Sequence, residues 1–181
     1  MFNYPLLGTL DTIITDEQPI LYQEHYRKLK RINKHENKWS YMLIVQENLC
    51  HVLIYKSIIG VRLRKDYQSN NLDNLKQDLL DLKKIRKLTK IFYESFLTQW
   101  NIENRSNGFD VQDIRFGSLF QRIDVTINKL SSYLKKQINE KKNSLSKYKE
   151  ALNDAKSRID KATNDYNNAV SQLNSAKSTL E

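Results

Sequence analysis

Glycine and proline are scarce in this sequence, with 4 and 2 occurrences among 181 residues. These two residues mark most turns, so their scarcity excludes an all-β fold, which needs many turns. Charged residues make up 28% of the chain and hydrophobic residues 39%, a balance that suits helices with wide solvated faces. The composition therefore predicts an all-α protein built from long, uninterrupted helices.

Cysteine and long apolar runs are also rare. The single cysteine, Cys50, excludes an internal disulfide, and its apolar neighbours Leu49 and Val52 indicate a buried small hydrophobe. The first residues lack the basic region of a signal peptide, and no apolar stretch approaches the roughly 20 residues of a membrane span. We therefore expect a soluble chain, either cytoplasmic or, if it is a fragment, at the cell surface or secreted.

The residue patterns that carry chemistry are missing as well. The glycines lie too far apart to form a phosphate-binding loop. His25, His35 and His51 do not fall at metal-ligand spacing, and no Ser/His/Asp arrangement is visible. The sequence thus predicts no catalytic residue, no cofactor and no metal site.

What is present is helical periodicity. Apolar residues recur at steps of three and four along three segments, which predict helices over about 19–34, 37–67 and 72–103. Residues 1–15 are expected to be extended, because Pro5 and Gly8 interrupt any helix there. Short connections between the helices indicate a small antiparallel bundle, which we assign to residues 1–130.

A last helix is predicted from about Asp113 to Glu181, and its second half has a different pattern. Its apolar positions alternate steps of three and four as in a coiled coil, which assigns residues 131–181 to a coiled-coil extension. Large and alanine positions alternate in this seam: Leu152, Ala155, Ile159, Ala162, Tyr166, Ala169, Leu173, Ala176 and Leu180. Alanine at every seventh residue allows close helix contact, so we expect self-association, most simply as an antiparallel dimer.

The connection before this last helix is a candidate interface. It combines turn residues, aromatic rings and possible ion pairs: Trp100, Asn104, Gly108, Phe109, Asp110, Gln112, Asp113 and Arg115. One interpretation is a buried structural corner, with Gly108 at positive φ, Asp113 capping the helix and Arg115 pairing with a nearby carboxylate. The other interpretation is a ligand site.

The same connection carries a family resemblance. The segment 100–119, WNIENRSNGFDVQDIRFGSL, resembles the signature W-x-x-E-N-K-P-x-G-F-E-V-Q-D-I-R-L-G-G-L of the C-terminal helical domain of bacterial family 20 β-N-acetylhexosaminidases. Residues 4–11, YPLLGTLD, are similar to the segment that follows the catalytic barrel in that family, and residues 49–67 are similar to the domain's central helix. The resemblance covers about residues 3–134, and the extension from about Ser132 lies outside it.

The resemblance implies a non-catalytic accessory domain whose partner is a (β/α)8 catalytic barrel, in cis or in trans. Tyr4, Ser106 and Ser118 depart from the family pattern. The adjacent Asp-Glu pair that the family uses for catalysis belongs to the barrel, and the one Asp-Glu here, Asp16-Glu17, precedes a helix of the wrong domain.

Other functions stay open at this stage. The seam alone would suit a coiled-coil interaction protein, with the bundle as its platform. The net charge of +9 and the lysines between Lys135 and Lys149 would suit an acidic partner or a nucleic acid, although charge spread around a helix is more often a solvated face. An enzyme in its own right is the least favoured alternative.

Overall fold

The computed structural model describes residues 13–35, 37–105 and 107–178, and within these ranges every regular element is a helix. The helices are α1 (Glu17–Ile32), α2 (Ser40–Lys56), α3 (Ile59–Gln68), α4 (Leu72–Glu103) and α5 (Asp110–Ser178). The chain forms two compact units, residues 1–134 and residues 135–181. The predicted all-α fold with a long C-terminal helix is confirmed. Of the segment 1–15 that we expected to be extended, residues 1–12 lie outside the described residues.

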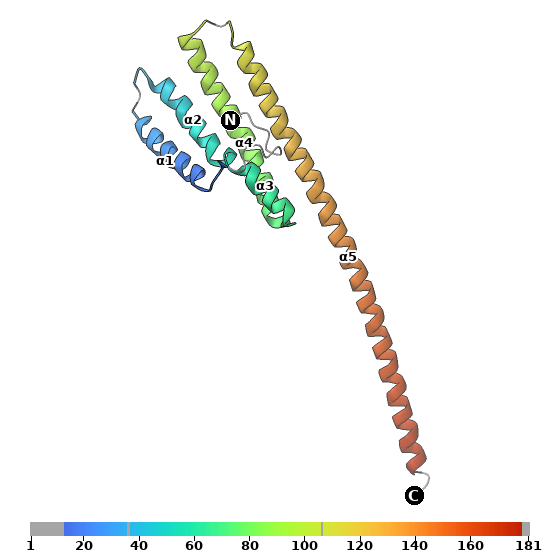
Figure 1. Cartoon of the computed structure of the whole chain (residues 1–181). Coiled ribbons are helices and arrows are strands. Elements are labelled where there is room, and N and C mark those ends of the chain that lie inside the picture. The colour runs from blue at the N-terminus through green and yellow to red at the C-terminus, as the bar shows by residue number, and fades with distance from the viewer. Residues whose placement is uncertain (1–12, 36, 106, 179–181) are drawn as a thin grey trace. The chain divides into compact units, whose positions relative to one another are not determined.

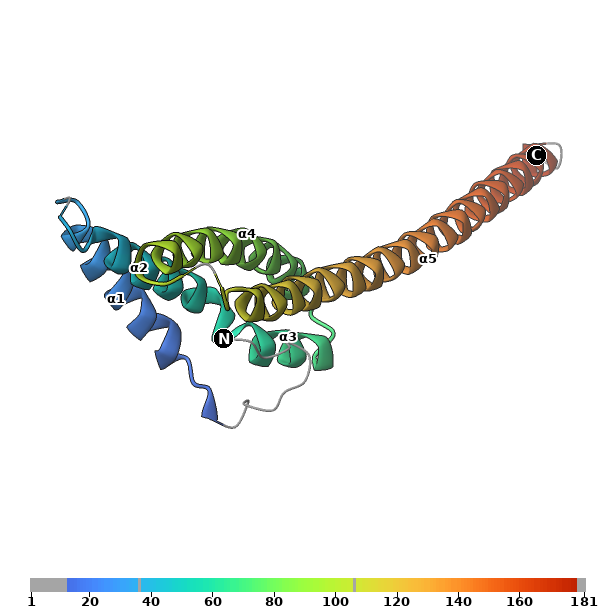
Figure 2. The ribbon, with the colours of Figure 1, turned by 90° about the horizontal axis from the view of Figure 1, so that it is seen from above.

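The first unit is an antiparallel bundle. Helix α2 packs between α1 and α4, and α3 packs on α4, as Figure 1 and Figure 2 show. The first part of α5, yellow in Figure 1, returns along α4. The core is a single cluster of buried aliphatic and aromatic side chains from α2, α3, α4 and this part of α5. Helix α1 contributes no buried residue to it.

The helix predicted over 37–67 is wrong in one respect, because the chain breaks after Lys56 into α2 and α3. Ser57 and Ile58 form a turn there. The buried residues Val52, Ile59 and Leu63 keep helical spacing across the break, so the apolar pattern does not reveal it. The break is a change of backbone geometry that leaves the buried face continuous.

One apolar stretch is longer than the sequence led us to expect. By length and composition alone, the helical stretch Ser40–Gln68 could cross a membrane. Core helices of bundles pass the same test, and this stretch packs on α1 and α4. It also carries Arg62 and Asp66 in a charged network described below.

Other helix boundaries follow local chemistry. Helix α4 has the predicted bounds. Asn71 caps its first turn, since the Asn71 side chain accepts a hydrogen bond from the backbone N–H of Asn74 at 3.1 Å. The turn before it holds Asn70 at φ 52°, a conformation that asparagine tolerates better than most residues. Helix α5 begins at Asp110, three residues before the predicted start.

The second unit is formed by the C-terminal part of α5. From Lys141 to Lys177 every described residue is exposed. The unit therefore has no core of its own, although its seam residues keep heptad spacing.

Candidate interface sites

The connection between α4 and α5 is built around an aromatic cluster. Phe96 and Trp100 on α4 meet Phe109, with ring centroids 5.9 and 5.5 Å from the Phe109 ring. The ring of Phe116, six residues after the start of α5, lies 5.6 Å from that of Phe92 and 5.1 Å from that of Tyr93. Phe109 and Phe116 are 6% and 2% exposed. Packed aromatic rings of this kind contribute beyond their buried area, so the cluster fixes the corner.

Trp100 forms hydrogen bonds with the backbone of the connection between α4 and α5. The indole Nε1–H of Trp100 donates to the carbonyl oxygen of Arg105 at 3.1 Å, and the backbone N–H of Asn104 donates to the carbonyl of Trp100 at 2.8 Å. Gly108 has φ 93°, in the region that glycine adopts without strain. The prediction of a positive φ at Gly108 is thus confirmed.

Two predicted roles at the corner are wrong. Asp113 does not cap α5, because the helix begins at Asp110; instead its carboxylate accepts a hydrogen bond from the Tyr93 hydroxyl at 2.7 Å. That bond is the main reason why the pKa of Tyr93 is raised. Among the described residues, Arg115 pairs with neither Asp110 nor Asp113. Arg115 is exposed to solvent.

The corner is also less buried than predicted. Phe109 is buried and Trp100 and Gln112 are half-buried, while the other candidates are exposed: Asn104, Gly108, Asp110, Asp113 and Arg115. The outer face of the first α5 turns is partly apolar, since Val111 and Ile114 are 47% and 72% exposed. Gly117 lies on this face, and a Cβ placed there would meet no atom within 4 Å. No packing within the described chain requires this glycine.

The seam is the second uncovered apolar surface. Leu152, Ile159, Tyr166 and Leu173 are 57%, 64%, 69% and 69% exposed. Ala155, Ala162, Ala169 and Ala176 are exposed between them, whereas Leu180 lies outside the described residues. Large apolar side chains are thus repeated along one exposed stripe of the second unit.

A buried charge network in the first unit was not anticipated from the sequence. Arg62 on α3 donates to Asp78 at 2.6 Å and also to Asp81, both on α4. Asp66 accepts from the Asn74 amide at 2.9 Å. Asp78 is fully buried and Asp66 is 5% exposed. In the sequence, the one sign of this network is that Asp78 occupies an apolar position of the helical pattern, between Leu75 and Leu82.

Burial has the largest effect on the pKa of Asp78. Desolvation raises the pKa of Asp78, and the ion pair with Arg62 opposes that shift. One carboxylate oxygen of Asp78 and one of Asp66 lack a hydrogen-bond partner in the described part of the chain. Within that part, no group of His, Cys, Asp and Glu is arranged to hold a metal ion. The bonds of Arg62 with Asp78 and Asp81 join α3 to α4.

The described residues form helices alone as regular elements, and two apolar surfaces are exposed on them. The family model of the Glycoside Hydrolase 20C C-terminal domain matches residues 1–158, and the chain belongs to that family. None of the curated proteins matches the chain. The match continues past residue 134, so the first part of the C-terminal extension belongs to the family domain as well. A domain boundary after residue 130 stays a prediction.

Proposed function

We propose that this chain is the non-catalytic helical accessory domain of a family 20 β-N-acetylhexosaminidase and that it packs on the catalytic (β/α)8 barrel, in cis or in trans. The family match over residues 1–158 carries the proposal. A C-terminal domain of a glycoside hydrolase accompanies a catalytic domain, and the described residues present uncovered apolar surface for such a contact.

The outer face of the first α5 turns is the surface we assign to the barrel. Among the described residues of the first unit, Ile114 is the most exposed large hydrophobic side chain, at 72%. Gly117 leaves room for close approach of another backbone. Arg115 and Asp113 flank this face and can form polar contacts at its rim. Interfaces commonly combine an apolar centre with such a polar rim.

The test is association in trans. The barrel of a family 20 enzyme that naturally carries this domain, with its own C-terminal domain removed, would be titrated with this chain by calorimetry. We expect a one-to-one complex that Ile114→Asp weakens at least about tenfold. Leu80→Asp is the matched control, because Leu80 is 57% exposed on α4. A barrel that is folded and active but does not bind the chain contradicts the proposal, as does equal weakening by both variants.

A second candidate function is self-association through the seam. The large residues and the alanines of the seam occupy the two apolar positions of each heptad, called a and d. In an antiparallel helix pair, position a of one helix faces position d of the other. The alternation of Leu152, Ala155 and Ile159 would then place one alanine and one large residue in every layer. A parallel pair would alternate layers of two large residues with layers of two alanines, which leaves voids. The sequence pattern thus favours an antiparallel dimer of this chain.

Sedimentation equilibrium tests the second candidate. The intact chain should be larger than a monomer at micromolar concentration. Deletion of residues 145–181, or the pair Leu152→Asp and Ile159→Asp, should give a monomer with an intact bundle. A monomeric intact chain, or a dimer that survives the deletion, would contradict it.

A further inference from the structure

Helix α1 lies on the surface of the bundle. It packs on α2 (Figure 2), and none of its own residues is buried. Just after its end, the Asn33 carboxamide donates a hydrogen bond to the Glu47 carboxylate of α2 at 2.7 Å. A helix of 16 residues is marginal in water by itself. Helix α1 therefore depends on its contact with α2 to stay folded.

The middle of that contact is a stack of aromatic rings. Tyr26 of α1 stacks on His51 of α2, with ring centroids 4.4 Å apart and planes at 26°. The ring of Tyr55, one turn further along α2, lies 6.4 Å from the His51 ring. All three side chains are half-buried. A neutral imidazole packs between two phenol rings as an ordinary aromatic group.

Ammonium groups lie at the hydroxyl ends of both tyrosines. Lys30 of α1 donates to the Tyr26 hydroxyl at 3.3 Å. Lys84 of α4 donates to the Tyr55 hydroxyl at 2.5 Å, with its Nζ 4.2 Å from the centre of that ring. On the opposite side of the charge balance stands Glu47, one turn before His51 on α2. An imidazolium at this position would thus face two cations and one anion from the three helices around it.

These surroundings oppose protonation of His51. Burial lowers its pKa below the ordinary value, Lys84 and Lys30 lower it further, and Glu47 opposes the shift. When α1 leaves α2, Tyr26 and Lys30 leave with it, and water reaches the imidazole. The pKa of His51 then returns toward about 6.5. Because the released state binds the proton more strongly, the contact is most stable above pH 6.5 and weakens as the pH falls below it.

We propose that His51 is a pH-sensitive switch that holds α1 on α2 at neutral pH and releases α1 in acid. The core does not depend on α1, since Val45 and Val52 of α2 join a cluster with α3, α4 and α5. Acid therefore uncovers the side of α2 that carries His51 and Glu47 while the rest of the bundle stays folded. The other two histidines, His25 and His35, are exposed, so their protonation has no such effect.

The test is native-state hydrogen exchange of the intact chain between pH 7.5 and pH 5.0, because exchange detects a rare opening. The opening constant of the α1 amides, corrected for the intrinsic exchange rate, should rise below about pH 6.5 by up to about tenfold per pH unit. The amides of Leu82 and Ile85 in the core of α4 should not follow this rise. An NMR titration should place the midpoint of His51 below 6.5.

Two variants and a matched control assign the effect to His51. His51→Phe keeps an aromatic ring that cannot be protonated, so the rise in acid should disappear, whereas His25→Phe should behave like the parent chain. Lys84→Met removes one cation, so the His51 midpoint should move up and the rise at pH 5.0 should become smaller. Three results would each overturn the proposal: no rise in the parent chain, a rise that persists in His51→Phe, or an equal rise in α4.

Discussion

In both units apolar residues recur at steps of three and four, but they are buried in the first unit and exposed in the second. On α4, Leu75, Leu82 and Ile85 are at most 1% exposed, whereas on the C-terminal part of α5 the ladder residues Leu152 and Ile159 are 57% and 64% exposed. Periodicity of three and four residues predicts a helix and its apolar face in both units. It does not specify what covers that face. Only the fold shows which apolar face is buried within the chain and which is left exposed.

The largest expected effect comes from the charged link between α3 and α4 in the covered unit. Arg62→Met should lower the free energy of unfolding by about 3–5 kcal/mol at neutral pH, because it leaves the buried Asp78 carboxylate unpaired. Urea denaturation measures the loss. The double variant Arg62→Met and Asp78→Leu should recover much of it, since the fully buried carboxylate is then absent, while Asp66 and Asp81 keep hydrogen bonds from Asn74 and Gln77.

The same variant has a predicted pH dependence. Burial raises the folded-state pKa of Asp78, and removal of Arg62 removes the cation that opposes this shift. The folded state then favours the neutral acid, so the penalty is present above the folded-state pKa and fades as the pH falls toward the unfolded value of about 3.9. A loss of stability that is the same at pH 4 and pH 7 would contradict this account.

A leucine truncated in each unit tests the comparison directly. Leu82→Ala should cost about 2–5 kcal/mol, because it opens a cavity in a packed core. Leu152→Ala, the matched control, should leave the bundle within about 0.5 kcal/mol of the parent, while weakening any dimer. The measurement is denaturation followed by circular dichroism, with sedimentation for the dimer. Equal losses at both sites would show that the two ladders do not differ.

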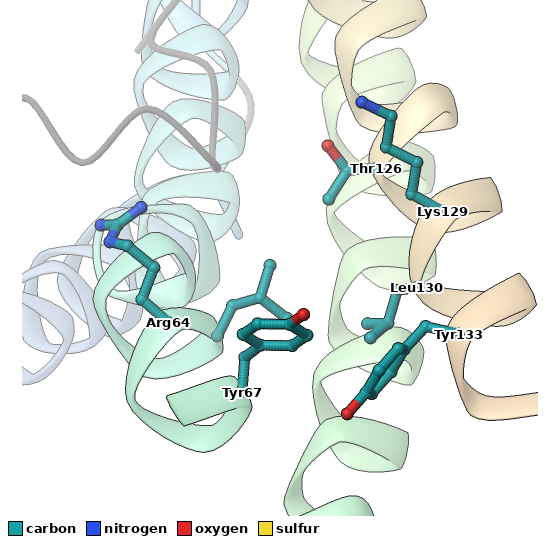
Figure 3. A pocket seen from close by; sticks show the side chains of 7 residues that line it. Arg64, Tyr67, Thr126, Lys129, Leu130 and Tyr133 are labelled. Carbon is teal, nitrogen blue, oxygen red and sulfur yellow. The ribbon is translucent and has the colours of Figure 1, made fainter. Parts of the chain in front are cut away.

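Much of the fold was predictable because local patterns and tertiary packing agree. The periodicity of Leu75, Leu82 and Leu88 predicts α4, and Gly108, at positive φ, marks the turn that leads into α5. The break between α2 and α3 was not predictable, since the buried face passes through it unchanged. The link from Arg62 to Asp78 joins residues on two helices, and only the packing of α3 on α4 brings them together. The cavity beside Tyr67, between α3 and α5 (Figure 3), likewise depends on tertiary packing.

Gly108 provides an intermediate effect, confined to the covered unit. Gly108→Val should cost about 1–3 kcal/mol, because φ 93° places a β-branched residue in a strained backbone region. Space is not the obstacle, since a Cβ would lie 3.8 Å from the Trp100 ring, an ordinary contact. Thermal unfolding measures the loss. An unchanged melting temperature would mean that the corner does not depend on its backbone conformation.

The smallest expected effect is a gain in stability, and it tests whether a partner covers the face of α5 that contains Gly117. Gly117 lies inside α5 with open space around the position of its Cβ, so Gly117→Ala should stabilise the isolated chain by up to about 1 kcal/mol through helix propensity alone. If the barrel approaches this face closely, the added methyl group should weaken that complex while the bundle becomes more stable. Ser118→Ala on the next residue is the control, because it changes a side chain without closing a backbone approach. Opposite signs for stability and association at Gly117, with little effect on association at Ser118, would identify a surface that serves a partner. A gain in stability with unchanged association would instead remove Gly117 from the interface.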